Sequence, residues 1–479
     1  MLSSSVKSEE ESCSRKNLRL FGTSGIRGRA NVEITPEMAA KLGVTFASFL
    51  GNRGTVAVGR DVRLPARPVQ YAFISGVLAG GVNVEDCGVA PTPAVLWTVK
   101  ERGLDGAAVV TGSHTPPEII GLLFFMRDTA EFSVEESVEF EKVFWGRAKT
   151  VAWNDVGKLY EVDALDLYTR SVLKCVDLRK IASSSFKVVM DPGNGASALL
   201  CDKILHAAGV KVVLINGDVD VLCPNRDPYP RPEVLGELGR RVVADRADIG
   251  SATDTDGDRA IFVDGEGNVL WGDVSGCVFV RDVLRRHGSG VIVAPINTSR
   301  LINWACEVYN GKMEYTKIGP PNIVSALKRS KAVFGLEETG KNIWPGTILY
   351  GDWLLATLRM LEILAEEQKS LSELVQEFPR FHMSKEAIRC PETSKNRVML
   401  NALRELEKRK EDAEVVTIDG IKITYSDGSW LLLRPSGTEP VFRVYAESQD
   451  LRRMHELIKM GSELVKKSLS VCSGESNLN

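Results

Sequence analysis

Residues 107–118 read AAVVTGSHTPPE, a short apolar stretch that runs directly into a polar loop. Two other stretches have the same form: TVAV at 55–58 runs into GRDVR, and KVVM at 187–190 runs into DPGNGA. Each is typical of a strand that ends in a loop, and helical stretches separate such strands along most of the chain. This alternation predicts an α/β fold with largely parallel sheets. Ligands of such sheets collect at the carboxyl ends of the strands, so we expect the functional residues in these loops.

The chain of 479 residues is too long for one compact core and predicts about three or four domains. Its C-terminal part differs from the rest. Strands are predicted at 415–418, 421–425, 430–434 and 442–447, followed by an amphipathic helix from Leu451. This pattern indicates a separate α+β domain with an antiparallel sheet, joined near Phe378. Before it, leucines at helical spacing in 353–365 predict a core helix.

Composition excludes several classes of partner. The 60 Lys and Arg residues nearly balance the 63 Asp and Glu residues, so we expect a small-molecule ligand rather than nucleic acid or an anionic membrane. No apolar run reaches the roughly 18 residues that cross a bilayer. The nine cysteines are scattered without a C-x-x-C pair, which indicates reduced thiols in a cytoplasmic protein. Residues 1–17 are rich in Ser, Glu and Lys, lack the apolar core of a signal peptide and are expected to form a disordered tail.

The stretch DTDGDRA at 254–260 gives the strongest indication of a specific chemistry. Asp254, Asp256 and Asp258 alternate, and Gly257 permits a tight turn between them. In an irregular loop this alternation can direct three carboxylates to one point, and hard carboxylate oxygens suit Mg²⁺. A calcium loop and a plain charged turn are the alternatives, although the glutamate of an EF-hand loop is missing. Arg259 is either a phosphate ligand or a solvated arginine.

Three further loops contain groups that suit a phosphate or a sugar. In TGSHTPPE, Ser113 lies in a loop that two prolines hold extended, so its hydroxyl can act as nucleophile or phosphoryl carrier. In LLLRPSGTEP, the guanidinium of Arg434, two hydroxyls and exposed amides suit a phosphate dianion. In FGLEETGK, carboxylates and a hydroxyl on a flexible loop can bind sugar hydroxyls. A plain loop or turn is the alternative for each.

Two loops place arginine near glycine: GTSGIRG contains Arg27, and GRDVR contains Arg60 and Arg63, with Asp61 available to pair with an arginine. Taken in chain order, FGTSGIRG, GRDVR, TGSHTPPE, DTDGDRA, GLEETGK and RPSGTEP resemble the α-D-phosphohexomutase family, which includes phosphoglucomutase, phosphomannomutase and phosphoglucosamine mutase. The resemblance runs from Phe21 to about Glu447. It implies a heart-shaped fold of three α/β domains and a C-terminal α+β domain around a central cleft.

The resemblance also implies where each part of the site lies. We expect the phosphoserine loop in a domain of residues 18–158, the metal loop in 159–264, the sugar-binding loop in 265–377 and the phosphate-binding loop in 378–479. The implied catalytic residues are Ser113, His114, Arg27 and Arg259. The implied Mg²⁺ ligands are Ser113, Asp254, Asp256 and Asp258. The implied substrate-binding residues are Glu337, Thr339, Lys341, Arg434, Ser436, Gly437 and Thr438.

The activity that the resemblance implies is interconversion of the 1- and 6-phosphates of glucose, mannose or glucosamine. Ser113 would carry the phosphoryl group, Mg²⁺ would be the cofactor, and a hexose 1,6-bisphosphate would be intermediate and activator. Thr115, Ile120 and Leu123 depart from the family pattern, which has asparagine at the first two positions and lysine at the third. Because that lysine is a suspected proton-transfer group, a phosphosugar-binding paralogue with impaired catalysis is one alternative. A Mg²⁺-dependent sugar phosphatase is the other.

Overall fold

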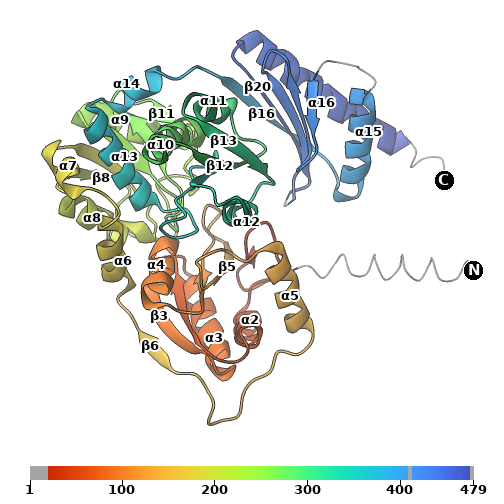
Figure 1. The fold of residues 1–479 in the computed structure, drawn as a ribbon. Coiled ribbons are helices and arrows are strands. Elements are labelled where there is room, and N and C mark those ends of the chain that lie inside the picture. The colour runs from red at the N-terminus through yellow and green to blue at the C-terminus, as the bar shows by residue number, and fades with distance from the viewer. Residues whose placement is uncertain (1–19, 408–412, 438, 475–479) are drawn as a thin grey trace, which may run out of the picture.

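The computed structural model of the protein describes residues 20–407, 413–437 and 439–474. They form four sheets with their helices (Figure 1). The expected tail at 1–17 lies outside the described residues. None of the described helices combines the length and the apolar character that crossing a bilayer requires.

The first sheet has the strand order β1-β5-β4-β2-β3-β6. Its central strands are parallel, whereas β5 pairs antiparallel with β1 and β4. The predicted strands at 55–58 and 107–110 are confirmed as β2 and β4. Its elements are β1 (Ile26–Arg29), α2 (Pro36–Phe49), β2 (Thr55–Arg60), α3 (Ala66–Ala79), β3 (Asn83–Val89), α4 (Thr92–Arg102), β4 (Gly106–Val110), β5 (Ile119–Met126), α5 (Val134–Trp145) and β6 (Leu159–Glu161).

The second sheet has the order β11-β10-β9-β7-β8, with β7 parallel to both of its neighbours. The predicted strand at 187–190 is confirmed as β7. Its elements are α6 (Ala164–Leu173), α7 (Leu178–Ser183), β7 (Lys187–Asp191), α8 (Cys201–Ala207), β8 (Lys211–Leu214), α9 (Gly236–Asp245), β9 (Ile249–Ala252), β10 (Ile261–Asp264) and β11 (Val269–Leu270). The expected boundary at 158/159 falls at the start of β6, which pairs with β3 of the first sheet.

The third sheet has the order β13-β12-β14-β15, in which only the β14–β15 pair is antiparallel. Its elements are α10 (Gly272–His287), β12 (Gly290–Pro295), α11 (Arg300–Val308), β13 (Gly311–Thr316), α12 (Pro320–Ser330), β14 (Phe334–Leu336), β15 (Asn342–Ile343), α13 (Trp353–Glu367) and α14 (Leu371–Gln376). The predicted leucine-rich core helix is confirmed as α13. It begins where the Asp352 carboxylate accepts the Leu355 amide hydrogen at 3.0 Å, a helix N-cap.

The fourth sheet is entirely antiparallel, in the order β16-β20-β19-β18-β17. Its elements are β16 (His382–Arg389), α15 (Lys395–Glu407), β17 (Ala413–Val416), β18 (Ile421–Tyr425), β19 (Trp430–Pro435), β20 (Val441–Ser448) and α16 (Leu451–Gly474). The predicted antiparallel sheet and final helix are confirmed. The strand β16 was not predicted, because HMSKEAIR alternates too weakly to indicate a buried face.

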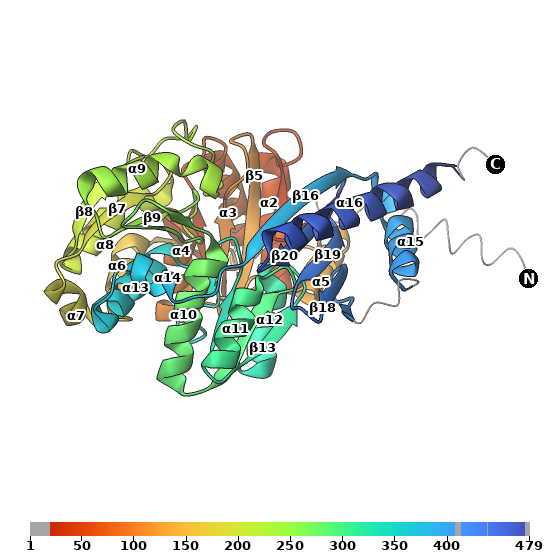
Figure 2. The ribbon, with the colours of Figure 1, turned by 90° about the horizontal axis from the view of Figure 1, so that it is seen from above.

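The four parts are arranged around a common centre. In Figure 1 the first sheet lies at the bottom, the second at the left, the third at the upper centre and the fourth at the upper right. Figure 2 shows β16 running from the centre of the molecule toward the helices of the fourth part. One continuous core joins α4 and β4 of the first part to the helices of the second and third. The fourth part has its own core between its sheet and α15 and α16.

Candidate active site

A cleft of about 700 Å³ lies where loops of all four parts meet. Most of the residues that the sequence nominates line it. They are Arg27, Ser113, His114, Arg259, Glu337, Thr339, Lys341, Arg434, Ser436 and Gly437. The three aspartates lie buried beneath Ser113, and Thr438 lies outside the described residues.

The serine loop is held in place by Arg63, which is 2% exposed. Its guanidinium donates to the carbonyl oxygens of Ser113 (2.5 Å), Thr115 (2.7 Å), Pro116 (2.6 Å) and Ile119 (2.8 Å). Ser113 has a φ of 50°, a left-handed conformation that is costly for a residue other than glycine. The arginine therefore stabilises the strained backbone that presents the serine hydroxyl.

Asp61 completes this support. Its carboxylate lies 3.3 Å from Nε of Arg63 and accepts the hydroxyl hydrogen of Thr111 at 2.8 Å. The interpretation that Asp61 pairs with an arginine of GRDVR is therefore confirmed. Gly112 has no room for a side chain, because an added Cβ would lie 2.1 Å from the Arg63 guanidinium.

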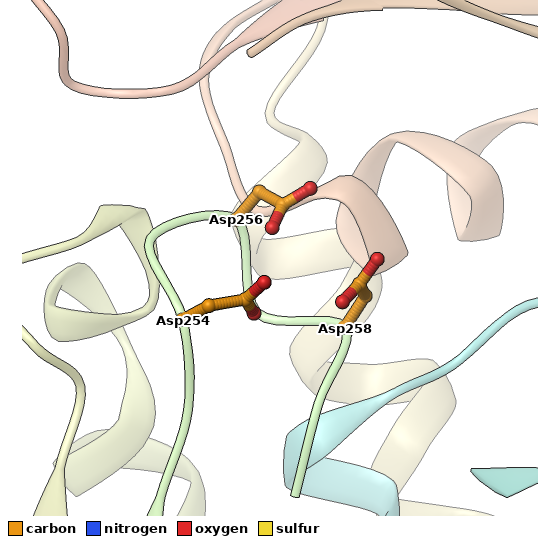
Figure 3. A group of neighbouring side chains, drawn as sticks. All are labelled: Asp254, Asp256 and Asp258. Atoms are coloured by element: carbon orange, nitrogen blue, oxygen red, sulfur yellow. The ribbon is translucent and has the colours of Figure 1, made fainter. Parts of the chain in front are cut away.

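The metal loop meets the serine loop directly. The hydroxyl of Ser113 donates to Oδ2 of Asp254 at 2.8 Å, although 141 residues separate the two. Figure 3 shows Asp254, Asp256 and Asp258 gathered on one loop between β9 and β10. One carboxylate oxygen from each lies within 4.8 Å of the others, and all three residues are at most 1% exposed. Gly257, with a φ of 78°, makes the turn that brings them together.

The electrostatics of this cluster favour a bound cation. Burial, and then the charges of Asp258 and Asp254, hold the pKa of Asp256 well above its ordinary value. Oδ1 of Asp256 has no hydrogen-bond partner. Three enclosed carboxylates with an unpartnered oxygen and hard donor atoms fit a divalent cation such as Mg²⁺.

Arg259 and His114 flank the serine hydroxyl. Nε of Arg259 lies 3.4 Å from Oδ2 of Asp254, and its guanidinium contacts Nδ1 of His114 at 3.0 Å. The same nitrogen of His114 lies 3.1 Å from the hydroxyl oxygen of Ser113. Burial and the charge of Arg259 hold the pKa of His114 well below its ordinary value, so the imidazole is neutral at pH 7.

The sugar loop contributes two glutamates and a lysine. Glu337 accepts the hydroxyl hydrogen of Thr339 at 3.1 Å, whereas Glu338 accepts from Asn297 at 2.7 Å and pairs with Lys385 of β16. Lys341 turns toward the metal loop, and its ammonium lies 2.7 Å from Oδ2 of Asp258. Lys341, which the resemblance implies to be a substrate-binding residue, therefore contacts the acidic cluster.

The phosphate loop follows β19. Arg434 forms an ion pair with Asp419 at 2.9 Å, which sets its guanidinium at the edge of the cleft. The ammonium of Lys395 donates to the carbonyl oxygens of Ser436 and Glu439, at 2.5 and 2.8 Å, and so fixes the turn from inside.

The three positions that depart from the family pattern have structural roles here. The Thr115 hydroxyl donates to the Gly112 carbonyl at 2.7 Å and closes the serine loop. Ile120 and Leu123 are fully buried in β5. The strand β5 therefore contributes no cation to the cleft at position 123.

Sequence reasoning missed several residues of the site. The ring of Tyr229 lies over the Arg259 guanidinium at 4.9 Å and against His114 at 5.3 Å. Glu131 is 3% exposed and accepts the hydroxyl hydrogen of Ser24 at 2.6 Å. Lys395 and the carbonyl contacts of Arg63 were also not foreseen. No local motif marks these residues, because each acts on a segment distant in sequence.

The fold and this site define a class of enzyme, the sugar-phosphate mutases. Four models of the phosphoglucomutase/phosphomannomutase family match the chain: α/β/α domain I at residues 18–149, domain II at 166–267, domain III at 271–381 and the C-terminal domain at 387–463. The chain belongs to the phosphoglucomutase/phosphomannomutase family and is accordingly a phosphomutase, an intramolecular phosphotransferase.

Similarity to individual proteins extends over most of the chain. A phosphoglucomutase/phosphomannomutase of Thermococcus kodakarensis is 36% identical, over 94% of this chain and 99% of that protein. A phosphopentomutase of the same organism is 35% identical, over 94% and 98%. Among solved structures, a phosphoglucomutase/phosphomannomutase family protein of Burkholderia thailandensis matches with a TM-score of 0.84 and 26% identity, over 94% of this chain and 98% of that one. These matches support the heart-shaped four-domain architecture.

Proposed function

We propose that this phosphomutase interconverts the 1-phosphate and 6-phosphate of a hexose, which is glucose, mannose or glucosamine. Ser113 carries the phosphoryl group, and a hexose 1,6-bisphosphate is both the intermediate and the activator. The observation that carries the proposal is the 2.8 Å contact between the Ser113 hydroxyl and Asp254, because it joins a nucleophile to an acidic cluster fit for a divalent cation.

The metal centre consists of Ser113, Asp254, Asp256 and Asp258. Bound there, Mg²⁺ supplies positive charge that stabilises the oxygens of the transferring phosphoryl group. Arg259 and Arg27 add fixed positive charge beside the serine. Closure of the cleft over bound substrate would exclude water from the phosphoserine and limit its hydrolysis.

The transfer step moves one phosphoryl group from serine to sugar. The bond between phosphorus and Oγ of Ser113 breaks as a bond forms between phosphorus and a sugar hydroxyl oxygen. The proton of that hydroxyl ends on Oγ of Ser113, so the step is balanced without a further reactant. The bisphosphate then reorients in the cleft, and its other phosphate returns to Ser113.

The remaining loops hold the substrate. Glu337 and Thr339 face the cleft with acceptor and donor groups that suit the hydroxyls of a pyranose ring. Arg434, Ser436, Gly437 and Thr438 bind the phosphate that is not being transferred. Because this loop belongs to the fourth part, substrate links that part to the other three.

The test of the proposal is Ser113→Ala. In coupled assays with glucose, mannose and glucosamine 1-phosphates, with Mg²⁺ and glucose 1,6-bisphosphate, we expect kcat/KM to fall by at least about 10⁴-fold because the phosphoryl carrier is lost. Intact-mass analysis after incubation with the bisphosphate should find one phosphoryl group on the unmodified protein and none on the variant. Equal activity of both proteins would refute the proposal.

The same assay, with ribose 1-phosphate as a fourth substrate, separates the competing functions. Stoichiometric release of inorganic phosphate from the 1-phosphates would indicate a sugar phosphatase. Preferential turnover of ribose 1-phosphate would indicate a pentomutase, the activity named for one relative. Binding of the sugar phosphates without turnover would indicate an impaired paralogue.

A further inference from the structure

Lys341 places a positive charge inside the acidic cluster. Its ammonium lies 2.7 Å from Oδ2 of Asp258 and donates to the Tyr350 hydroxyl at 3.1 Å, and the residue is 5% exposed. The ammonium also lies 4.4 Å from the centre of the Tyr350 ring, which attracts a cation. Lys341 is therefore held at the cluster from two sides.

Several carboxylates lie around Lys341, and Nε of Arg259 lies 3.7 Å from Oδ1 of Asp258. The three aspartates are joined by Glu131, whose Oε2 has no hydrogen-bond partner and whose carboxyl group interacts electrostatically with Lys341 and Asp258. The ammonium of Lys341 is in direct contact with one of these carboxylates, that of Asp258.

The first three motif loops, FGTSGIRG, GRDVR and TGSHTPPE, contain no lysine. The neighbouring face of β5 presents Leu123 and Phe125, both fully buried, and Phe125 packs edge-on against Tyr350 at 5.1 Å. The positive charge that contacts Asp258 here belongs to Lys341. This residue lies in a loop of the third part of the molecule, 83 residues after Asp258 in the chain (341 − 258).

We infer that Lys341 is a positioning residue of the metal centre, a built-in cation that neutralises Asp258 in the metal-free protein and lowers the affinity of the aspartate cluster for a divalent cation. This rests on the proposed metal centre. A fixed positive charge beside the ligands both keeps three repelling carboxylates in place and opposes the entry of a second cation. The centre is thus assembled before metal binds and exchanges metal readily.

The test measures Mn²⁺ affinity of the full-length protein by calorimetric titration, with Mn²⁺ as the probe ion. We expect Lys341→Met and Lys341→Gln each to bind Mn²⁺ at least about tenfold more tightly than the unmodified protein, because the opposing charge is gone. In EDTA both variants should unfold at lower temperature, and Mn²⁺ should raise their Tm more than it raises that of the unmodified protein. A residue that served only packing would leave the affinity unchanged or weaken it.

Lys422→Met is the matched control. Lys422 is also a buried lysine, 4% exposed, with its ammonium 4.2 Å from the centre of the Trp430 ring, but it donates to the Ile296 carbonyl and does not contact the cluster. Its loss should not change Mn²⁺ affinity. Lys341→Arg, which keeps the charge, should stay closer to the unmodified protein than either neutral variant.

Three outcomes decide the inference. Unchanged or weaker affinity in the neutral variants overturns the role of Lys341 alone. If the unmodified protein binds no Mn²⁺, or if Asp256→Asn does not weaken binding, the metal centre itself is wrong and the inference falls with it. If neither neutral variant folds, NMR of the lysine side chains of the unmodified protein decides. If Mg²⁺ does not shift the signal of Lys341, the contact between Lys341 and the metal centre is contradicted.

Discussion

Glu131 makes the stability of the molecule depend on pH. Burial raises the pKa of its carboxyl from 4.5 to about 7. Between these values the unfolded chain has lost the proton that the folded protein keeps, so raising the pH lowers the free energy of unfolding, by up to about 3 kcal/mol. Below pH 4.5 the group is protonated in both states and this penalty is absent.

We therefore expect Glu131→Gln to be more stable than the unmodified protein at pH 8 and to lose that advantage near pH 4.5. Urea unfolding in EDTA at the two pH values measures the difference directly. Glu101→Gln, at an exposed position of α4, is the control and should show no such dependence. An advantage of Glu131→Gln that is equal at both pH values would contradict the titration.

At the scale of elements, the serine loop that follows β4 is held by the side chain of Arg63, which lies just after β2. Arg63→Met would leave four carbonyl groups without their donor and Asp61 without its counter-ion. Removing one partner of a buried ion pair costs about 3–5 kcal/mol. We expect urea unfolding to show a decrease of this size in the free energy of unfolding. We also expect kcat to fall at least about 100-fold, because the serine is no longer positioned.

Arg60→Met separates this role from a general effect of the GRDVR loop. Arg60 donates to the carbonyl of Asp61 at 3.3 Å and does not reach the serine loop through any contact seen in the described residues. Its loss should cost less than about 1 kcal/mol and leave kcat within a few-fold. Similar losses in both variants would show that the loop is not held by Arg63 in particular.

The elements and site residues that could be predicted are those with a local signature. The strands β2, β4 and β7 are largely buried, contain valine and end in polar loops, and Asp254, Asp256 and Asp258 lie within five residues. The contact of Lys341 with Asp258 and the position of Tyr229 over Arg259 join loops from different parts of the chain. Periodicity and spacing within one segment contain no information about such contacts.

At the scale of the whole molecule, the fourth part is tied to the third beside the cleft. Lys385 of β16 pairs with Glu338 of the sugar loop, and Asn297 fixes that glutamate at 2.7 Å. The phosphate loop lies on the same sheet as β16, so this ion pair favours arrangements in which the phosphate loop faces the serine. Less of the binding free energy of the substrate is then needed to bring the phosphate loop into the position that faces the serine.

Loss of this ion pair should therefore affect substrate binding more than stability. For Lys385→Met we expect the KM for the sugar phosphate to rise about threefold to fivefold, the effect of up to about 1 kcal/mol for a partly exposed pair, with kcat within twofold. Small-angle scattering should show a larger radius of gyration without substrate and a normal one at saturation. Lys467→Met removes a 2.8 Å pair with Glu405 inside the fourth part and should change neither quantity. If the two variants behave alike, the bridge to Glu338 does not set the position of the phosphate loop.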